Sequence, residues 1–516
     1  MISKQTLDKI RPIVGPPGTG KTHIKIKKLY AELSDKYGTE RGIVLSHTKV
    51  AAAELQATIK SIDKIKTSNL LQLDEDYFQY RICTIHSYAK KHGGERREVF
   101  SSKSDFNNLC NHVPLFNLKK NAAITKDPQK NHPFFRCNAE AHGRGLNISD
   151  HWHTAADPHN SYKPYNLQLI LKMKEGYEKF KKDEFLQDYQ DMIDVYVRKP
   201  KVPAVDFLII DEAQDLSRSQ WTMARSIWDK TQDTYIAGDD DQAIFRWAGA
   251  DVDSFIAQTG KIVQLTQSYR IPQVVHDVAS RIVNKIQHRL PKEWRPKTQR
   301  GLLSYYDEFK NINMKQGNWL VLARTRFMLN ELEEQLYAQG LYYENKYKTN
   351  KEQDLYKAVT DWENVRKGVH INYDQLERIA SYMSNNHFEK QSLKYMDKDA
   401  NYDMAGLRER AWLKTDKVWY EALDQAPSRS IRYIRRMREN GEKLNSSPRI
   451  TLSTIHGVKG GEQDNVVLLT DLSRNTQINY EKNPDDENRL FYVGATRAKQ
   501  HLHIVRPKDN YKGYKI

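Results

Sequence analysis

Cysteine is scarce in this chain. The 516 residues contain three cysteines, Cys83, Cys110 and Cys137, and none of them has the close spacing of a paired motif. Disulfide frameworks need paired cysteines and belong to oxidising compartments. The cysteine content therefore excludes a disulfide-stapled secreted domain and indicates a reducing compartment, so we expect a cytoplasmic protein.

Long apolar runs are also missing. No stretch reaches the roughly 18 apolar residues that a membrane span needs. The first ten residues, MISKQTLDKI, contain no apolar core of signal-peptide length. The sequence therefore predicts a protein that has no membrane partner.

Metal-binding spacing is missing from the part of the chain that is richest in His and Cys. Neither C-x2-C nor H-x3-H occurs there, and these are the spacings that zinc sites commonly use. We expect solvated or packed side chains, not a zinc site, at Cys110, His112, His132, Cys137, His142, His151, His153 and His159.

Positive charge is in excess. The chain has 82 Lys and Arg against 66 Asp and Glu, a formal net charge of +16. Such an excess favours a polyanionic partner, because cationic side chains contact phosphates and release counterions. The length predicts three or four structural units at about 100 to 200 residues each.

Short apolar runs, such as FLII from Phe207 and WLVLA from Trp319, recur between longer polar segments that look helical. Runs of this kind are typical of strands buried on both faces of a parallel sheet. They form two groups, and a long segment without such runs interrupts each group. The predicted boundaries are 1–89 and 199–264 for the first α/β domain, 90–198 for its insertion, 265–341 and 449–516 for the second, and 342–448 for its insertion.

A phosphate-binding loop is the clearest motif. GPPGTGKT matches G-x-x-x-x-G-K-[ST] and precedes a helix-like segment that begins at His23. In such loops backbone N–H groups wrap the phosphates, Lys21 reaches the β and γ oxygens, and Thr22 offers a hydroxyl to Mg²⁺. The sequence therefore predicts that ATP and Mg²⁺ bind at Gly15, Pro16, Pro17, Gly18, Thr19, Gly20, Lys21 and Thr22.

The segment FLIIDEAQD supplies the carboxylates that this chemistry needs. It reads as a buried strand that ends in Asp211 and Glu212, so both carboxylates emerge at the carboxyl edge of the sheet. We expect Asp211 to hold Mg²⁺ and Glu212 to orient and deprotonate the attacking water.

DEAQD resembles the DExx box of the UvrD/Rep-type superfamily 1 DNA helicases, and further segments follow in that family's order. The segments that resemble motifs Ia, Ib, III, IV, V and VI are LSHTKVAAAEL (45–55), TIHSYAK (84–90), GDDDQAIFRWAGA (238–250), LTQSYR (265–270), STIHGVKGGEQDNVVLL (453–469) and RLFYVGATRAK (489–499). The resemblance implies an α/β fold of two RecA-like P-loop NTPase domains with parallel sheets. Each domain would carry an inserted, mainly helical subdomain, and ATP would bind between the two.

The same resemblance implies roles for particular residues. Gln242 would sense the γ-phosphate or position water, while Arg270 and Arg497 would meet the charge of the transferring phosphate from the second motor domain. Glu462 is similar to the motif V carboxylate near the ribose. Catalytic roles are thus expected for Lys21, Glu212, Gln242, Arg270 and Arg497.

A motor that steps along a strand needs backbone contacts and a platform on which bases stack. Trp247 aligns with the motif III aromatic that the family places against a base. The resemblance implies backbone contacts, at positions where packing is an equally good reading, for Thr48, Thr84, His86 and His456.

Three positions depart from the family's pattern. His47 stands where motif Ia usually has an aromatic, and Ala248 stands where motif III usually has an Arg, although Arg246 precedes it. The family commonly reads adenine with a Gln some two dozen residues before the P-loop Lys. Here 20 residues precede Lys21, and Gln5 lies too close, so we expect relaxed base selectivity.

The function expected from these residues is ATP-dependent 3′-to-5′ translocation of a monomeric motor along single-stranded DNA, with unwinding at single-strand/duplex junctions. The polarity rests on the resemblance, and RNA stays open as a substrate. Two alternatives stay open: a translocase that displaces proteins without productive unwinding, and a nucleotide-gated nucleic-acid-binding protein. Replication or repair proteins are the expected partners.

Overall fold

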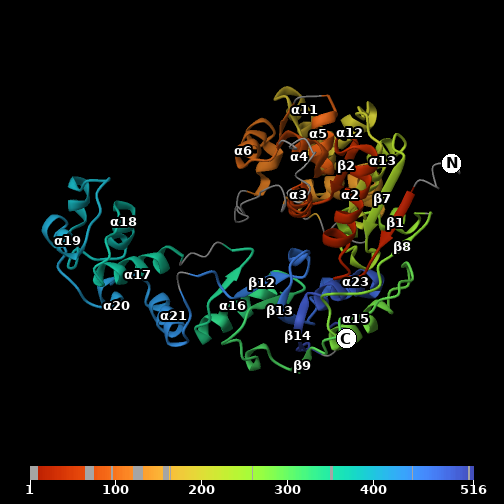
Figure 1. Ribbon diagram of the computed structural model, residues 1–516. Helices are drawn as coiled ribbons and strands as arrows, with labels where there is room; N and C mark the ends of the chain where they lie inside the picture. Colours follow the sequence, from red (N-terminus) through yellow and green to blue (C-terminus); the bar gives the residue numbers. More distant parts are fainter. Residues whose placement is uncertain are drawn as a thin grey trace. The chain divides into compact units, whose positions relative to one another are not determined.

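The protein is described here from a computed structural model, shown in Figure 1. It describes residues 10–63, 75–94, 97–119, 132–154, 162, 164–258, 260–348, 353–443, 446–509 and 512–516, so Gln5 and His159 lie outside the described residues. The chain forms two compact units. Unit 1 comprises Met1–Gln299 and Asn483–Tyr492, and unit 2 comprises Arg300–Lys482 and Val493–Ile516.

Unit 1 is built on a six-stranded sheet in which every strand pair is parallel. The strand order is β3-β2-β6-β7-β1-β8. In that order the strands are β3 (Ile82–Thr84), β2 (Gly42–Ser46), β6 (Phe207–Asp211), β7 (Asp233–Gly238), β1 (Ile10–Val14) and β8 (Val263–Gln264).

The apolar run of β6 shows why its sequence does not alternate between apolar and polar residues. Leu208 and Ile210 belong to one hydrophobic core, and Phe207 and Ile209 belong to another. Successive side chains of a strand point to opposite faces, so both faces of this sheet are covered. The helices that contribute residues to these two cores are α2 (Lys27–Tyr37), α3 (Lys49–Asp63), α4 (Glu75–Arg81), α5 (Ile85–His92), α12 (Tyr189–Arg198), α13 (Arg218–Trp228) and α14 (Val252–Ile256). Unit 1 also contains α15 (Gln273–Val283), and α23 (Pro484–Ala495) begins in unit 1 and ends in unit 2.

The first insertion is mainly helical, as predicted, and has its own aromatic core that includes Phe100, Phe134 and Tyr177. His132 caps a helix by accepting a hydrogen bond from Phe134 N (3.2 Å), and His151 Nε2 lies 2.7 Å from the Tyr162 hydroxyl. Both histidines are buried, so they pack as expected. The elements are β4 (Glu98–Val99), α6 (Lys103–His112), η3 (Pro114–Lys119), α8 (Pro133–Gly143), α9 (Ile148–Thr154), α11 (Leu167–Asp183) and β5 (Leu186–Gln187).

Unit 2 contains a second parallel six-stranded sheet, so the prediction of two such sheets is confirmed. Its strands, in spatial order, are β11 (Tyr343–Asn345), β12 (Ile450–Thr454), β10 (Trp319–Ala323), β13 (Gln463–Leu469), β14 (Ala498–Val505) and β9 (Leu302–Tyr306). Helices α16 (Met328–Gln339) and α22 (Arg474–Lys482) belong to the same unit.

The second insertion lies between β11 and β12 and is also mainly helical. Its core is separate from that of the sheet and includes Trp362, Trp419 and Ile434. The helices are α17 (Gln353–Arg366), α18 (Tyr373–Ser381), η8 (Lys390–Tyr395), α19 (Met404–Arg410), α20 (Trp419–Ala422) and α21 (Ser428–Glu439). Among the described residues, no helix combines the length and the apolar character that crossing a bilayer requires.

The predicted boundary between the two motor domains differs from the division into units. Residues 265–299 were expected in the second motor domain, yet they cluster with unit 1. Their attachment begins where Leu265 N donates to Val14 O at 2.8 Å, beside the pairing of β8 with β1. The segment that resembles motif IV therefore continues directly from the edge of the first sheet.

A buried histidine on β14, beside a partly exposed one, gives a prediction about acid stability. His503 is 4% exposed, and its ring lies beside those of His501, Trp319 and Tyr306, at 3.6, 4.8 and 5.8 Å between centroids. Burial, and then the charge of His501, lower the pKa of His503 to about 3. Neither ring nitrogen of His503 has a hydrogen-bond partner among the described residues.

Because the unfolded chain takes up this proton near pH 6.5 and the folded chain near pH 3, the neutral ring stabilises the fold fully above pH 6.5. That stability is lost as the pH falls through this window, by about 1.4 kcal/mol per pH unit. We expect His503→Phe to lose less melting temperature between pH 7 and pH 5 than the parent. The exposed His370→Gln is the control and should follow the parent, whereas an equal acid loss in all three proteins would contradict the prediction.

Candidate functional site

The carboxyl ends of three neighbouring strands bring the predicted ATP-site motifs together in unit 1. Strands β1 and β7 pair so that Val14 lies beside Gly238, and β6, which ends at Asp211, pairs with the other side of β7. The phosphate loop, DEAQD and GDDDQ follow these three strands directly. Ligands of parallel α/β sheets bind at this edge.

The phosphate loop is held by its own backbone. Lys21 Nζ donates to Gly15 O at 2.6 Å, and Thr19 Oγ1 donates to Pro16 O at 2.9 Å. The loop then enters η1 (Lys21–Ile26), a wide π-type turn in which both Ile24 N and Lys25 N donate to Gly20 O at 3.0 Å. The prediction that these residues form one loop before a helix agrees with this geometry.

Thr22 and Asp211 come together as a magnesium site requires. The Thr22 hydroxyl donates to Asp211 Oδ2 at 2.9 Å, although 189 positions separate the two residues. Burial, and then the neighbouring charge of Glu212, raise the pKa of Asp211 to about 7. A hydroxyl and a buried carboxylate are hard oxygen donors, so the pair fits Mg²⁺.

Glu212 has a strained backbone. Its φ is 53° and its ψ is 39°, a left-handed conformation that side chains other than Gly rarely adopt. Such strain persists where the surroundings over-determine it, and it gathers at functional sites. The Gln214 side-chain amide donates to the Glu212 carboxylate. The turn after β6 therefore fixes the orientation of this carboxylate, which is predicted to activate the attacking water.

Gln242 lies in the turn after β7 and is 8% exposed. Its Nε2 donates to Asp239 Oδ2 at 2.8 Å, while Asp239 N donates to Gln214 Oε1 at 3.0 Å. Gln214, which the sequence did not single out, therefore connects the turn that carries Glu212 with the turn that carries Gln242.

Arg270 lies beside the phosphate loop within unit 1. Tyr269 N donates to Gly18 O at 2.8 Å, and Ser268 Oγ donates to Pro17 O at 2.9 Å. A Cβ added to Gly18 would lie 2.4 Å from the Arg270 Cβ. Arg270 thus belongs to the same unit as Lys21, whereas the resemblance implied a position in the second motor domain.

Arg497 belongs to unit 2 and is 2% exposed. Its Nε donates to Val493 O at 2.9 Å, and its Nη1 donates to Gly461 O at 3.4 Å. These bonds place Arg497 next to the segment that carries Glu462. His456 begins the short turn η9 (His456–Val458) after β12 and is partly exposed.

Trp247 is 51% exposed in the short turn η6 (Arg246–Ala248). The left-handed Gly249 ends this turn, with a φ of 98°. Arg246, which precedes the tryptophan, donates from Nη1 to Asp486 Oδ1 at 3.1 Å. Its guanidinium is therefore held by a carboxylate of α23, while the indole ring offers an exposed face.

Two of the four residues predicted to contact the nucleic-acid backbone cap helices. Thr48 accepts from Ala51 N at 3.1 Å, and Thr84 accepts from Ser87 N at 3.2 Å, so each hydroxyl caps a helix. The Thr48 O–H can still donate to a phosphate, because a hydroxyl both accepts and donates, whereas the Thr84 hydroxyl is buried and also lies 2.9 Å from Ser87 Oγ.

His86, another of these four residues, packs against an aromatic ring. Its ring lies 5.5 Å from that of Tyr189, between centroids. Burial, and then the charge of His47, lower the pKa of His86 to about 4. A neutral imidazole is therefore expected at neutral pH, and it suits hydrogen bonding better than charge pairing.

The sequence missed four residues that support this site. Gln214 lies within DEAQD and bonds to Glu212, whereas Arg289, Lys292 and Arg489 come from distant parts of the chain and contact the turn of three Asp. The run of three Asp after a buried strand was the available signal, because buried carboxylates need counter-charges. It could not say which cations supply them.

Comparisons with known proteins agree with these motifs. The family model described as the UvrD/REP helicase N-terminal domain matches residues 3–262, and the UvrD-like helicase C-terminal domain matches residues 449–505. The ATP-dependent DNA helicase PcrA of Bacillus subtilis (strain 168) is 22% identical over 464 residues, which cover 67% of this chain and 62% of that protein.

PcrA of Staphylococcus aureus (strain Mu50) is 22% identical over 314 residues, which cover 57% of this chain and 41% of that protein. PcrA of Staphylococcus epidermidis is 20% identical over the same number of residues. The matched region thus spans about two fifths to three fifths of the length of these relatives.

A close contact between two glycines predicts how Trp247 is held. A Cβ on Gly249 would lie 2.3 Å from the Gly143 Cα at the end of α8, so the first insertion packs directly on the motif III turn. Gly249→Ala must therefore meet both the left-handed strain of about 1–2 kcal/mol and an overpacking cost of about 1–3 kcal/mol.

The matched control is Gly441→Ala, where φ is 76° and nothing lies within 4 Å of an added Cβ. It meets the strain alone. We expect Gly249→Ala to lower the melting temperature more than the control does and to weaken binding of single strands. Equal effects of both substitutions would show that the glycine contact does not matter.

Proposed function

Because the chain belongs to the UvrD/Rep helicase family, we propose that it is an ATP-dependent motor that translocates along single-stranded DNA and unwinds duplex. The observation that carries the proposal is the gathering of Lys21, Thr22, Asp211, Glu212 and Gln242 at one edge of one sheet. The proposed polarity is 3′ to 5′, and the proposed active form is a monomer.

In this proposal Lys21 and the backbone N–H groups of the phosphate loop bind the β and γ phosphates. Thr22 and Asp211 hold Mg²⁺, which neutralises phosphate charge when it is bound. Glu212 accepts the proton of the attacking water, and Gln242 orients that water or the γ-phosphate. Arg270 and Arg497 stabilise the charge on the transferring phosphate.

Trp247 provides the proposed stacking platform for the bases. The turn that exposes Trp247 follows Gln242 by a few residues. One short segment of chain therefore connects the phosphate site with the indole ring. Thr48, Thr84, His86 and His456 are the proposed contacts to the strand. Single-strand/duplex junctions are the proposed substrate.

The function is tested by strand separation on duplexes with a 3′ or a 5′ single-stranded tail, together with ATP hydrolysis measured with and without single strands. We expect hydrolysis to be stimulated by single strands and the 3′-tailed duplex to be unwound. Lys21→Ala should lower turnover about 100-fold or more, since a charge-stabilising donor is lost, while strand binding persists.

The other outcomes are distinct. Hydrolysis without stimulation by single strands would contradict a motor function. Unwinding of the 5′-tailed duplex alone would reverse the polarity. Displacement of a protein block from single strands without strand separation would favour the translocase that clears proteins.

Trp247→Ala tests the stacking platform. Stacking of a base on an aromatic ring contributes about 1–3 kcal/mol, so we expect weaker binding of single strands and a loss of their stimulation of ATP hydrolysis. Basal hydrolysis should stay near that of the parent. Trp412→Ala, which removes a tryptophan that is 64% exposed in the second insertion, is the matched control. Equal stimulation in Trp247→Ala and the parent would remove the stacking role.

A further inference from the structure

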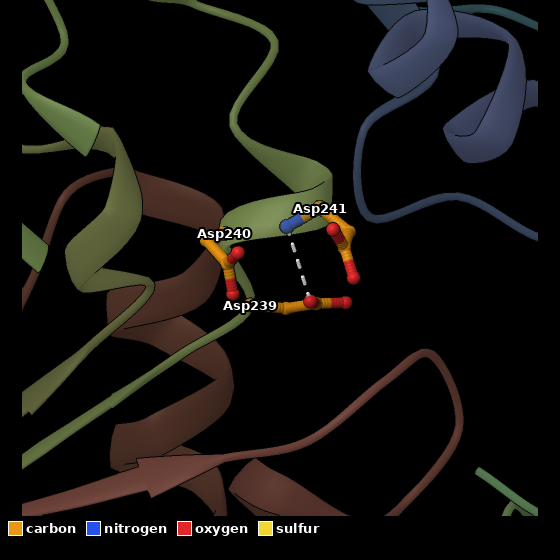
Figure 2. Close-up of side chains that lie close together, drawn as sticks. All are labelled: Asp239, Asp240 and Asp241. Carbon is orange, nitrogen blue, oxygen red and sulfur yellow. Dashed lines mark hydrogen bonds between the residues drawn. The ribbon is translucent and has the colours of Figure 1, made fainter. Parts of the chain in front are cut away.

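Three consecutive carboxylates are buried in the turn after β7. Figure 2 shows Asp239, Asp240 and Asp241, with the hydrogen bond from Asp241 N to Asp239 Oδ1 dashed at 3.3 Å. All three residues are 0% exposed, and one oxygen of each lies within 4.8 Å of those of the others. Like charges so close and so far from water need a counter-charge in the same place.

Lys292 supplies that charge. Its side chain is 1% exposed, and its Nζ lies 3.1 Å from Asp239 Oδ1 and 2.7 Å from Asp241 Oδ2, with Asp240 as a third partner. An ammonium has three N–H donors, one for each carboxylate. The cluster is therefore occupied by a cation that belongs to the chain, and it is not an open metal site.

Lys292 and Asp239 keep their charges despite burial, whereas burial raises the pKa of Asp240. Burial opposes the charged form of Lys292, but Asp239, Asp241 and Asp240 outweigh it and raise the pKa of the ammonium. Burial likewise opposes ionisation of Asp239, but Lys292 and then Lys21 outweigh it and lower the pKa of that carboxyl. Asp239 is thus held as a carboxylate, which accepts hydrogen bonds on both oxygens.

The two oxygens of Asp239 have different partners. Oδ1 pairs with Lys292 and accepts from Asp241 N at 3.3 Å, and Oδ2 accepts from Gln242 Nε2 at 2.8 Å. The backbone N of Asp239 donates to Gln214, whose amide donates in turn to Glu212. A carboxylate fixed at one oxygen has little freedom at the other, so Lys292 constrains the direction in which the Gln242 amide points.

We propose that Lys292 is a positioning residue for ATP hydrolysis, which acts by fixing Asp239 and through it the side chain of Gln242. The proposal rests on the motor function proposed above. Groups that orient the ligands of a metal typically affect activity about 10- to 100-fold, and we expect a loss of similar size when Lys292 no longer orients Gln242 through Asp239.

Arg289 offers a matched comparison in the same cluster. It binds Asp241 through two hydrogen bonds of 2.7 Å, whereas Lys292 also pairs directly with Asp239. Removing either cation leaves the negative charge of the cluster in excess. Of the two, Lys292 is the one that pairs with Asp239 Oδ1, an oxygen that also accepts from Asp241 N at 3.3 Å. A role in folding alone would therefore make the two substitutions alike.

The experiment is a double-mutant cycle on the turnover of ATP in the presence of single strands. We expect Lys292→Met to lower kcat about 10- to 100-fold, with little change in KM for ATP or in strand affinity. In a Gln242→Ala background, Lys292→Met should lower kcat no further. Arg289→Met should lower kcat by the same factor with and without Gln242→Ala.

A second pair covers the case in which Lys292→Met does not fold. Lys292→Met combined with Asp240→Asn removes one positive and one negative charge together, so the net charge of the cluster is unchanged. It is compared with Asp240→Asn alone, and the same loss of kcat and the same dependence on Gln242 are expected.

The outcomes separate this proposal from the motor function. Parent-like kcat in Lys292→Met, or a loss that multiplies with that of Gln242→Ala, overturns the role of Lys292 and leaves the motor function standing. A parent protein that does not hydrolyse ATP, or one in which Gln242→Ala is silent, overturns the proposed site and this inference with it.

Discussion

The parallel pairing of β7 with β1 on one side and with β6 on the other is the constraint on which the rest of the site depends. It sets Val14 beside Gly238, so the chain leaves both strands at the same level. The bond from Thr22 to Asp211 then closes the site across β7. A shift of either pairing by one residue would turn every side chain of the strand to the opposite face. Lys21, Asp211 and Gln242 would no longer converge.

Charge is concentrated at this edge, and the fold compensates it locally. Lys292 and Arg289 form ion pairs with the buried run of three Asp. Arg489 is 0% exposed and donates from Nε to Asp240 O at 3.0 Å. Arg489 lies in the segment that resembles motif VI, yet it belongs to unit 1 with the turn it supports. Motif VI is thus shared, because the chain passes from unit 1 to unit 2 between Tyr492 and Val493.

The first insertion takes part in the site as well as interrupting the sheet. Its helix α8 ends at Gly143, against Gly249, so the turn that exposes Trp247 is packed from the insertion side. Gln214 and Asp239 fix the other end of the same segment through Gln242. The segment from Gln242 to Gly249 is therefore held at both ends. In the proposed coupling, a nucleotide-dependent shift of Gln242 would reach Trp247 through this short segment.

The sequence by itself determined the parts of the protein whose chemistry is local. GPPGTGKT predicts a loop whose successive backbone amides face a phosphate. FLIIDEAQD predicts a buried strand that ends in carboxylates, and the continuous apolar runs predict sheets covered on both faces. Each signal lies within about ten residues, so the two parallel sheets and the prediction of a phosphate loop followed from it. The helical insertions and the roles proposed for Trp247 and Arg497 rest on the resemblance to the family.

Only the tertiary structure decided which distant groups meet. Nothing near Lys292 in the sequence marks it as the partner of Asp240, 52 positions earlier, and Gly143 carries no signal for its contact with Gly249. The unit to which residues 265–299 belong was likewise set by the pairing of β8 with β1 and not by a motif. A counter-charge or a close packing contact can come from any part of the chain that the fold brings near. The run of three aspartates indicates that a counter-charge is needed. Which residue supplies that counter-charge is decided by the tertiary structure.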